Sequence, residues 1–468
     1  MSGPETAIRL GYLLAAASFV LGLHLMNSPA TARRGNLLSA AGMALAVLMT
    51  VVHLVLDRPG IVGPVALVVG VALGGVAGAL MARRVPMTGM PQLVSLFNAV
   101  GGGAAALVAL TEYLRLAGAG SVPARVTVTT VLDVVIGGVT FTGSLLAAGK
   151  LQGWIRGNPI LFPGRRPVSA ALVAIVLAGA VLVLVTPSVP VLLVVTLAAL
   201  GFGVAMVLPI GGADMPVVIS LLNAFTGTAV AMAGFVLHST ALIIAGALVG
   251  ASGTILTKLM ADAMNRSVLS IMVGGFGTGD AVAEVTAADG AAVRRTTVED
   301  AAIQLGYARK VIVVPGYGLA AAQAQHELSG LAELLAAHGV EVSYAIHPVA
   351  GRMPGHMNVL LAEANVPYPL LKEMEEINPE FPLADVALVV GANDVTNPAA
   401  RRAGNPVSGM PILDVDQARS TIVIKRSMGH GYAGIDNELY TAPGTSMLFA
   451  DAKSGLAELT ASVKTLVA

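Results

Sequence analysis

Three consecutive polar residues, Lys425, Arg426 and Ser427, stand where a β-branched run ends. Two cations and a hydroxyl at the carboxyl end of a strand can bind an anion such as a phosphate group, because charged donors form strong hydrogen bonds to it. The alternative is a solvated basic pair. The next segment, 429–434, is rich in glycine and contains Tyr432, which is typical of a mobile lid. The stretch therefore predicts an anion site beneath a loop.

A second glycine-rich segment has the form of a dinucleotide fingerprint. The run 311–315 predicts a buried strand, and Gly316-Tyr317-Gly318 a tight turn into an Ala-rich helix. In this pattern the first Gly makes the turn and the second lets backbone approach a pyrophosphate. A small third residue, here Ala321, lets the helix pack on the strand, and the helix N-terminus faces the phosphates. A tight turn without a ligand is the alternative interpretation.

Other candidate residues follow the neighbouring strands. The segment 347–352 lacks the acid that usually holds the ribose of NAD, and Arg352 favours a phosphorylated cofactor instead. Asp394, in the loop 391–398, is either an Asx-turn residue or a carboxylate close to a nicotinamide. Asp451 and Ala452 follow the last predicted strand.

These residues require a sheet to position them. We expect six strands, alternating with helical segments, at 310–315, 340–346, 385–390, about 411–414, 420–426 and 446–449. This alternation predicts an α/β, Rossmann-like, doubly wound parallel sheet over residues 293–468, with its ligand beyond the carboxyl ends of the strands.

The rest of the chain is too apolar for a soluble protein. Of 468 residues 12% are charged, against about a quarter in soluble domains, and 55% are hydrophobic. We predict an α-helical membrane bundle of nine helices over residues 1–262 and a linker over 263–292. Spans of about 20 residues are expected near 7–26, 37–56, 61–82, 92–114, 127–149, 168–186, 189–208, 216–237 and 240–260. The first is interpreted as an uncleaved span rather than a signal peptide.

The net charge and the absence of cysteine exclude several classes of function. A net charge of zero argues against a nucleic-acid partner. The absence of cysteine excludes disulfides, thiolate catalysis and Cys metal sites. Basic residues near the span ends predict that the C-terminal domain is cytoplasmic and the N-terminus outside. The predicted inner side has ten, namely Arg33, Arg34, Arg83, Arg84, Lys150, Arg156, Arg165, Arg166, Lys258 and Arg266, and the outer side four, namely Arg9, Arg58, Arg115 and Arg125.

An internal repeat relates two of the spans. The sequence Met90-Pro-Gln-Leu-Val-Ser-Leu-Phe-Asn98 recurs as Met215-Pro-Val-Val-Ile-Ser-Leu-Leu-Asn223, at an offset of 125 residues. Copies that open two spans in the same direction predict a pseudo-twofold bundle. Each Asn lies about 10 Å along its helix, so we expect both to line one water-filled path. The alternative is that each Asn only joins helices.

Other polar residues of the spans are weaker candidates for a proton path. Ser252 lies within the last span, and Asp214 in a short turn on the inner side is either an exit group or a helix N-cap. Glu112, Asp133 and His238 are expected near the outer ends of their spans, where water can solvate them.

Taken in order, the motifs are similar to one family. Pro315-Gly-Tyr-Gly318, the segment 347–356, the loop 391–398, Lys425-Arg-Ser427, Gly431-Tyr-Ala433 and Ala450-Asp-Ala-Lys453 resemble those of the β subunits of proton-translocating NAD(P) transhydrogenases. The resemblance extends over essentially the whole chain. It implies an enzyme of the Re/Si-specific type in the bacterial inner membrane, surrounded by lipid, that couples hydride transfer between NADH and NADP⁺ to proton translocation.

The resemblance also implies cofactors and partners. NADP(H) would bind this chain in an orientation flipped relative to ordinary Rossmann domains. NAD(H) would bind an alpha subunit that carries additional membrane helices, and the expected assembly is a homodimer of alpha-beta units. Hydride would pass directly between the nicotinamides, which requires alignment and exclusion of water rather than a nucleophile.

Site residues are carried over from the same resemblance. Lys425, Arg426 and Ser427 match the segment that grips the 2′-phosphate, Tyr432 the lid, and Asp394 a carboxylate that links the cofactor site to proton movement. The full set of expected cofactor-binding residues is Gly316, Tyr317, Gly318, Ala321, Val349, Ala350, Gly351, Arg352, Met353, Pro354, Gly391, Ala392, Asn393, Asp394, Lys425, Arg426, Ser427, Gly431, Tyr432, Ala433, Asp451 and Ala452. Residues expected to act in catalysis or on the proton path are Asp394, Asn98, Asn223, Ser252 and Asp214; we expect no metal.

One position departs from the family. Some members carry a histidine, believed to hold the proton, where this chain has Asn98. An amide does not titrate in the useful range. The protonatable group is then supplied by helices of the partner, which we favour, or by His24, His53 or an acidic residue. Two other functions use the same architecture, a transporter or channel gated by an NADP sensor and a nucleotide-binding scaffold without turnover.

Overall fold

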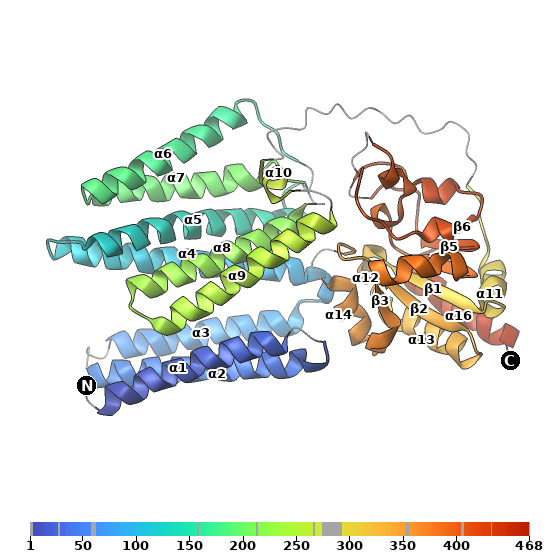
Figure 1. Ribbon diagram of the computed structural model, residues 1–468, viewed down its shortest axis with the longest axis horizontal. Coiled ribbons are helices and arrows are strands. Elements are labelled where there is room, and N and C mark those ends of the chain that lie inside the picture. Colours follow the sequence, from blue (N-terminus) through green and yellow to red (C-terminus); the bar gives the residue numbers. More distant parts are fainter. Residues whose placement is uncertain are drawn as a thin grey trace. The chain divides into compact units, whose positions relative to one another are not determined.

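The computed structural model describes residues 3–467, except 27–28, 58–61, 157–158, 212–213, 265–266, 274–292, 352–354, 404–406 and 432. The chain divides into two compact units, which are described separately below (Figure 1). One holds the long helices and is called the helical unit. The other holds the sheet and is called the sheet domain.

Within the described residues nine helices are long and apolar enough to cross a membrane, which confirms the nine predicted spans. They are α1 (Gly3–Leu25), α2 (Pro29–Asp57), α3 (Val62–Arg84), α4 (Met90–Gly118), α5 (Ala124–Gln152), α6 (Arg165–Val185), α7 (Val189–Val207), α8 (Met215–Val236) and α9 (Thr240–Ala263). A short 3₁₀ helix, η1 (Met87–Gly89), precedes α4, and α10 (Val268–Val273) lies inside the predicted linker. Most of that linker lies outside the described residues.

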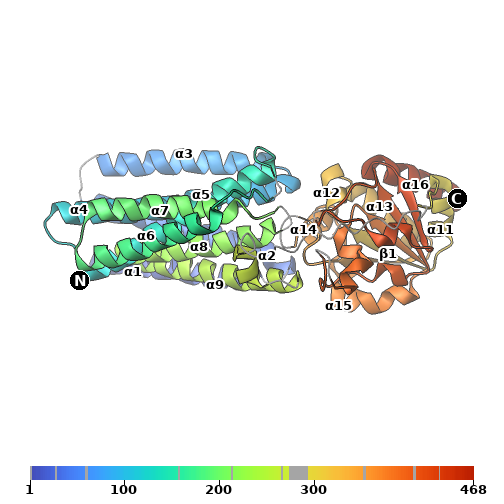
Figure 2. The ribbon, with the colours of Figure 1, turned by 90° about the horizontal axis from the view of Figure 1, so that it is seen from above.

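Helix α5 is central to the packing of the helical unit, because α4, α7 and α8 all contact it (Figure 2). The helices approach each other where glycines leave out a side chain. A Cβ added at Gly137 of α5 would lie 2.5 Å from the carbonyl oxygen of Gly102 in α4. One added at Gly203 of α7 would lie 2.5 Å from the carbonyl oxygen of Val139. Such close backbone approach gives membrane helices the packing energy that the hydrophobic effect does not supply between them.

The two copies of the repeat pack side by side in register. A Cβ added at Gly101 of α4 would lie 2.8 Å from Cγ2 of Thr226 in α8, and these positions differ by the repeat offset of 125. Farther along the same pair, Val230 packs against the cluster that contains Ala105, again at an offset of 125. Equivalent positions therefore meet across α4 and α8, as expected for parallel copies related by a pseudo-twofold axis between them.

Helix α9 packs on α8 through small residues. A Cβ added at Gly227 would lie 2.4 Å from the backbone nitrogen of Gly250, and one at Gly246 would lie 2.4 Å from that of Ala231. The two backbones thus touch directly, and a side chain at either glycine would force them apart.

A lysine of α5 caps the C-terminal end of α7. Lys150, in the last turn of α5, is buried, and its Nζ donates to the carbonyl oxygens of Leu208 and Ile210 at 2.5 and 2.8 Å. The last carbonyls of a helix have no partner inside the helix and carry partial negative charge. The ammonium group therefore serves as a cap supplied by another helix.

The sheet domain has six parallel strands in the order β3-β2-β1-β4-β5-β6. They are β1 (Lys310–Pro315), β2 (Glu341–Ile346), β3 (Leu371–Glu373), β4 (Val386–Val390), β5 (Ser420–Lys425) and β6 (Thr445–Phe449). The helices are α11 (Val298–Gly306), α12 (Tyr317–Ala322), α13 (Gln325–Ala337), α14 (His356–Glu363), α15 (Met374–Ile377) and α16 (Ala452–Val467). Short 3₁₀ helices are η2 (Tyr368–Leu370), η3 (Asn378–Leu383), η4 (Asp394–Thr396), η5 (Pro398–Arg401), η6 (Val415–Gln417) and η7 (Glu438–Thr441). This confirms the predicted doubly wound sheet.

One predicted strand is wrong and one was missed. The residues 411–414 are not part of the sheet. The sixth strand is instead β3, at the edge beside β2. The apolar residues of 411–414 are buried all the same, because Ile412 and Leu413 pack into clusters beside the sheet. Burial without backbone pairing produced the same sequence pattern as a strand.

The sheet is covered on both faces. Helices α11, α12 and α13 all contact α16 on one face. The other face packs Ile312 and Val314 of β1 against Phe381 and neighbouring residues of α15 and η3. The β-branched runs of the central strands are therefore buried on both sides, as in parallel sheets generally.

Candidate functional site

The two central strands end in glycine loops that lie against each other. β1 and β4 are neighbours, and the chain turns to opposite sides of the sheet from them, which makes this the switch point where doubly wound sheets bind ligands. The Gly316 N–H donates to the carbonyl of Val390 at 2.9 Å, and the Gly318 N–H donates to that of Gly391 at 2.9 Å. The backbone of both loops is thereby fixed at the predicted dinucleotide site.

These glycines are required by the packing of the loops. A Cβ at Gly316 would lie 2.3 Å from Cα of Ala392, and one at Gly318 would lie 2.6 Å from Cα of Gly391. Gly391 also has φ +68°, which favours glycine. The glycines of the fingerprint thus allow the loop after β1 to contact the loop after β4. The close approach to a pyrophosphate that the fingerprint also predicts is a separate role.

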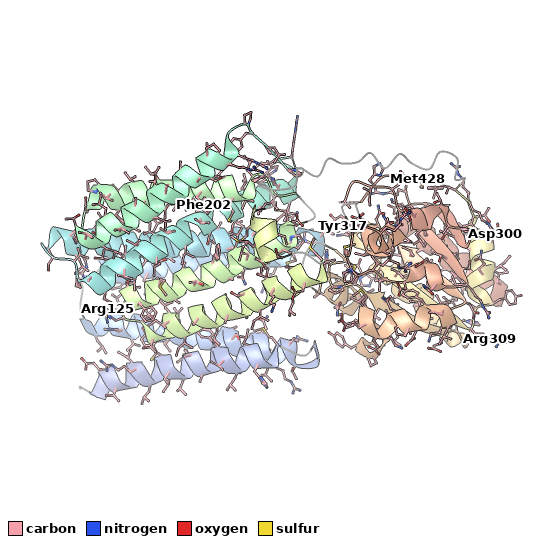
Figure 3. The ribbon with its side chains drawn as sticks, turned by 45° about the horizontal axis from the view of Figure 1, so that its top comes forward. Arg125, Phe202, Asp300, Arg309, Tyr317 and Met428 are labelled. Carbon is pink, nitrogen blue, oxygen red and sulfur yellow. The ribbon has the colours of Figure 1, made fainter. Side chains whose placement is uncertain are left out.

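The helix after the fingerprint differs from the prediction. α12 is only six residues long and ends at Gln323, which adopts the left-handed conformation with φ +52°. Because the helix turns away so soon, Leu319 and Ala320 are its buried residues, whereas Ala321 is exposed. The predicted packing role of Ala321 is therefore wrong. Tyr317 opens α12 and its ring lies 6.4 Å from that of His356 (Figure 3).

A buried histidine positions the loop after β2. Nε2 of His347 lies 2.8 Å from the carbonyl oxygen of Pro411, and Nδ1 accepts the N–H of Val349 at 3.2 Å. Burial lowers the pKa of His347 to about 4, against the smaller opposing effect of the Pro411 hydrogen bond. Ala350 is buried and Gly351 has φ +103°. Of the other residues predicted in this loop, Arg352, Met353 and Pro354 lie outside the described residues.

The cationic segment after β5 meets the glycine-rich loop that follows it. Nζ of Lys425 donates to the carbonyl of Gly429 and lies 4.7 Å from the centroid of the Tyr440 ring. Burial lowers the pKa of Lys425, while the nearby carboxylates of Asp394 and Asp436 act in the opposite direction. Arg426 and Ser427 are exposed, as is Met428 beyond them (Figure 3). These two side chains are accessible to an anion.

Asp394 holds the other end of the same loop. Its Oδ2 accepts the N–H of Ala433 at 3.0 Å, and a Cβ added at Gly431 would lie 2.3 Å from its Oδ1. The amide of Asn393, oriented to satisfy both donors, accepts the Gly431 N–H at 2.7 Å and Nζ of Lys425 at 3.3 Å. The structure therefore brings the predicted residues Asn393, Asp394 and Lys425 together beneath residues 429–433. Tyr432 lies outside the described residues.

Two asparagines that the sequence interpretation missed hold this arrangement together. Nδ2 of Asn397 donates to the carbonyl of Asp436 at 3.0 Å. Nδ2 of the buried Asn437 donates to the carbonyl of Asn393 at 2.9 Å, and its Oδ1 accepts the Leu439 N–H at 2.9 Å. Their only signal in the sequence is their position in loops after strands, where Asn commonly bonds to backbone.

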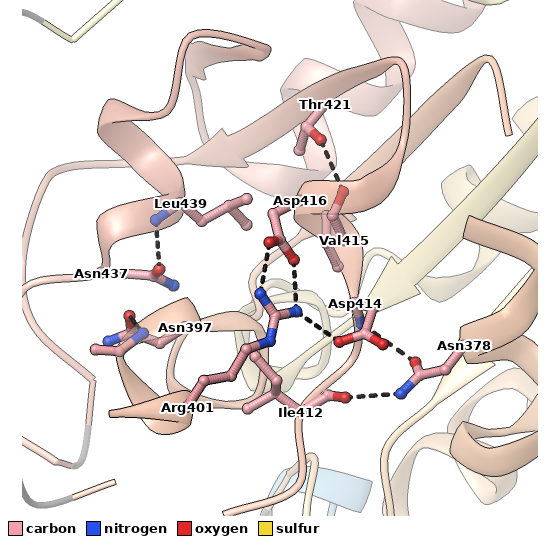
Figure 4. A network of polar contacts seen from close by, with 11 residues as sticks. Asn378, Asn397, Arg401, Ile412, Asp414, Val415, Asp416, Thr421, Asn437 and Leu439 are labelled. Carbon is pink, nitrogen blue, oxygen red and sulfur yellow. Dashed lines mark hydrogen bonds and ion pairs between the residues drawn. The ribbon is translucent and has the colours of Figure 1, made fainter. Parts of the chain in front are cut away.

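A charged network supports the residues that were predicted as a strand (Figure 4). The guanidinium of Arg401 donates to Asp416 at 2.6 and 2.9 Å and to Asp414 at 2.6 Å. These carboxylates raise the pKa of Arg401. Nδ2 of Asn378 donates to the carbonyl of Ile412 at 2.9 Å. The Leu413 N–H also donates to the carbonyl of Val395 at 2.9 Å, so side chains and one loop backbone contact take the place of ladder hydrogen bonds in this segment.

Asp451 and Ala452 form the start of α16. Oδ1 of Asp451 accepts the N–H of Lys453 at 3.0 Å, and Ala452 is buried. They follow β6, which is the edge strand, two places from β4. Their predicted contact with the cofactor stays a prediction.

Within the helical unit Asn98 contacts α8. Its Nδ2 donates to the carbonyl of Ile219 at 3.3 Å, and its own carbonyl accepts from Oγ1 of Thr226 at 3.2 Å. Asn98 is buried, whereas Asn223 is only half-buried. The observed contacts are those of a residue that joins helices, and a shared water path stays a prediction.

The remaining candidates of the proton path lie elsewhere. Oγ of Ser252 bonds to the carbonyl of Val249 in its own helix at 3.2 Å. The buried hydroxyls nearby are instead those of Ser220 and Thr257, 3.1 Å apart. Asp214 occupies the N-cap position of α8, as one interpretation predicted, but its side chain makes no capping hydrogen bond to the helix.

The ends of α4 and α5 hold the expected solvated charges. Glu112 pairs with Arg115 at 2.6 Å, and Arg125 lies 2.8 Å from Nδ1 of His238. Asp133 differs from these residues in its exposure to solvent. Its side chain is completely buried, so the prediction that water solvates it is wrong.

Comparison with known proteins agrees with this architecture. The family model of the NAD(P) transhydrogenase beta subunit matches residues 8–462. Two curated sequences from Rhodospirillum rubrum, both named NAD(P) transhydrogenase subunit beta, are each 48% identical over 449 residues. That alignment covers 94% of this chain and 96% of each relative.

Proposed function

Because the chain belongs to the family of NAD(P) transhydrogenase beta subunits, we propose that its sheet domain binds NADP(H) at the switch point between β1 and β4. The family's activity is hydride transfer between NADH and NADP⁺ coupled to proton translocation, and NADP(H) supplies the nicotinamide of this subunit. The observation that carries the proposal is the convergence of Asn393, Asp394 and Lys425 beneath one loop at that switch point.

The chemistry of the residues fits a phosphorylated dinucleotide. Lys425, Arg426 and Ser427 offer two cations and a hydroxyl, which suit the 2′-phosphate. Arg426 and Ser427 are exposed, and Nζ of Lys425 has only a neutral carbonyl and an amide oxygen as close hydrogen-bond acceptors among the described residues. An incoming phosphate therefore offers Lys425 a stronger acceptor than the Gly429 carbonyl does.

Replacement of the Gly429 carbonyl by a phosphate, as the acceptor for Lys425, would release one attachment of the loop that begins at Gly429. Residues 429–433 are held at one end by Lys425 and at the other by Asp394. A ligand that draws Lys425 away releases the first attachment and leaves the second. We therefore assign Asp394 the role of a positioning residue, whose carboxylate keeps the loop over the nicotinamide while water is excluded.

The proposal extends to the partner and the topology. An alpha subunit carries the NAD(H) site and additional membrane helices, and the complex is a homodimer of alpha-beta units of Re/Si specificity. The excess of basic residues on one side supports a sheet domain in the cytoplasm and an N-terminus outside the bacterial inner membrane. The linker and domain limits are those predicted from the sequence, with 263–292 joining 1–262 to 293–468.

Binding measurements on the full chain test the cofactor site. The wild type should bind NADP⁺ far more tightly than NAD⁺. Lys425→Ala or Arg426→Ala should weaken NADP⁺ binding about 10- to 100-fold, the effect of one charge-assisted hydrogen bond. Weak NAD⁺ binding should stay unchanged. Lys464→Ala, in the last turn of α16, is the matched control for loss of a surface cation. Equal losses for both nucleotides would refute the 2′-phosphate assignment.

Reconstitution tests the coupling. The alpha-beta complex in liposomes should change the internal pH during hydride exchange between NADPH and an NAD⁺ analogue. Hydride exchange without any pH change would refute coupling, while leaving the cofactor site intact.

A further inference from the structure

The membrane helices contain an acidic side chain that the mechanism has not used. Asp133 of α5 is completely buried, and neither of its carboxylate oxygens has a hydrogen-bond partner among the described residues. An ionised carboxylate without a partner is strongly disfavoured in an apolar interior. An ionisable group placed so deep in a membrane bundle is by default a candidate for a proton relay.

Asp133 belongs to a polar stripe along one face of α5. Thr130, Asp133, Thr140 and Ser144 are all completely buried, and with Gly137 they are spaced by alternate steps of three and four residues. This spacing keeps them on one side of a helix. Within the described residues Oγ1 of Thr130 and Oγ of Ser144 also lack a hydrogen-bond partner. The stripe therefore retains unused hydrogen-bonding capacity at three of its members.

The stripe faces α4 and leads to Asn98. Gly137 and Thr140 both contact Gly102 of α4, and the carbonyl of Ser144 accepts from Oγ of Ser95 at 2.8 Å. Asn98 lies one turn beyond Ser95 on the same helix and is bonded to α8. Polar groups thus extend from Asp133 along the contact between α4 and α5 as far as the side-chain amide of Asn98, which cannot titrate.

Asp133 is the titratable member of this set. Among the helices that contact α5, α7 and α8 contain no titratable residue in their sequences, and α6 has only Arg165 and Arg166 at its start. Those of α4 are Tyr113, which is buried and packs against Val131, two residues before Asp133, and Glu112 and Arg115, which pair with each other. The other charged residues of α5 itself are Arg125 and Lys150 near its two ends. At the depth of Asp133, α4 presents alanines and leucines such as Ala109 and Leu110.

We propose that the carboxyl group of Asp133 carries the proton through the helical unit, a role that depends on the proton translocation and topology proposed above. The residue lies nine positions after Ala124, or about 14 Å from the predicted outer end of α5. The carboxylate takes up a proton from the outer side and becomes a neutral acid. It then releases the proton toward Thr140, Ser144 and Asn98 and returns to the carboxylate. The group expected from partner helices is thereby supplied by this chain.

The test uses the whole alpha-beta complex in liposomes, with proton movement and hydride transfer measured together. Asp133→Asn keeps the shape but cannot titrate, so coupled hydride transfer and proton movement should both fall about 100-fold, the usual contribution of a proton-transferring side chain. Exchange of hydride between NADH and an NAD⁺ analogue through NADP(H) that stays bound requires no net proton movement. It should persist within about twofold, which shows that the variant is folded.

Two further variants complete the design. Asp133→Glu retains a titratable group and should recover most of the coupled rate. Glu112→Gln, an acid of the neighbouring helix paired with Arg115, should leave coupling unchanged. A fully coupled Asp133→Asn variant would overturn the inference and leave the proposed function standing. A wild-type complex that transfers hydride without moving protons would overturn the proposed function itself.

Infrared difference spectroscopy tests the assignment without relying on turnover. Spectra of the wild-type complex at acidic and alkaline pH should contain a protonated carboxyl band that changes frequency in Asp133→Glu. If no carboxyl band differs between wild type and Asp133→Glu, the inference is wrong, even if Asp133→Asn does not assemble.

Discussion

The helical unit and the sheet domain satisfy their polar side chains in different ways. In the helical unit many hydroxyl groups bond to the preceding turn of their own helix, as Oγ1 of Thr196 does to the carbonyl of Leu192 at 2.8 Å, although a few, such as Oγ of Ser95, bond to a neighbouring helix. In the sheet domain side-chain amides bond across large sequence distances, as Asn437 does to Asn393. Local bonds survive any movement of a helix as a rigid body. Long-range bonds hold loops in one arrangement, which a binding site needs.

The glycine loops should give the largest loss of stability in this comparison. Gly391→Ala adds a Cβ at φ +68° and 2.4 Å from Cα of Gly318, so we expect a loss of about 4 kcal/mol. Gly339→Ala is the matched control, because φ is +84° but nothing described lies within 4 Å of the added Cβ, and should cost about 1 kcal/mol. Hydrogen exchange at β1 and β4 measures both. Equal effects would mean that loop contact adds nothing to backbone strain.

His347 should make the sheet domain sensitive to acid. Its pKa is about 4 in the folded protein and 6.5 ordinarily, so the unfolded chain binds more protons between these values. Stability is therefore complete above about pH 6.5 and falls by up to about 3 kcal/mol as the pH approaches 4. Hydrogen exchange in β2 as a function of pH measures this. His347→Gln should remove the dependence in this range, whereas His326→Gln, at an exposed position, should not.

Loss of a long-range hydrogen bond from a side-chain amide should give the next largest loss of stability. Asn437→Ala leaves the Leu439 N–H without its acceptor and removes one donor from the Asn393 carbonyl, which keeps those of Thr396, at a cost of about 2 kcal/mol. The same change should weaken NADP⁺ binding, because the loop after β4 loses its support. Gln417→Ala, at an exposed position, is the control for removing an amide and should change neither quantity. Unchanged stability in Asn437→Ala would contradict the contrast between the two regions.

Loss of a local hydroxyl bond should have the smallest effect. Thr196→Val preserves the shape of the side chain and removes only a bond within α7, so the change should stay within about 0.5 kcal/mol. Thermal unfolding of the full chain in detergent measures it. A loss as large as that of Asn437→Ala would mean that local hydroxyl bonds of the bundle matter as much as the amide contacts of the sheet domain.

The contrast between local and long-range contacts also explains which elements could be predicted from the sequence. The membrane spans and the central strands are continuous apolar runs, and their burial depends on composition alone. The run 411–414 has similar composition, but Arg401 and Asn378 hold it from a distance, so it was mistaken for a strand. β3 has only three residues, Leu371–Glu373, and no β-branched side chain, so nothing in its composition marks it.

Site residues follow the same division. Lys425, Arg426 and Asp394 are recognisable because charge next to a strand end predicts chemistry directly. His347 and Asn437 act through backbone groups 64 and 44 residues away, which no local pattern contains. The burial of Asp133 depends on how neighbouring helices pack around α5, which the sequence of α5 alone does not contain.

The register between the two repeat copies constrains how the chain can vary. Gly101 and Thr226 occupy equivalent positions, yet one has no side chain and the other fills the space beside it. Two threonines would collide there and two glycines would leave a gap. Relatives that enlarge one of these positions should therefore shrink the other, so that a bundle built from duplicated halves has to keep them unequal.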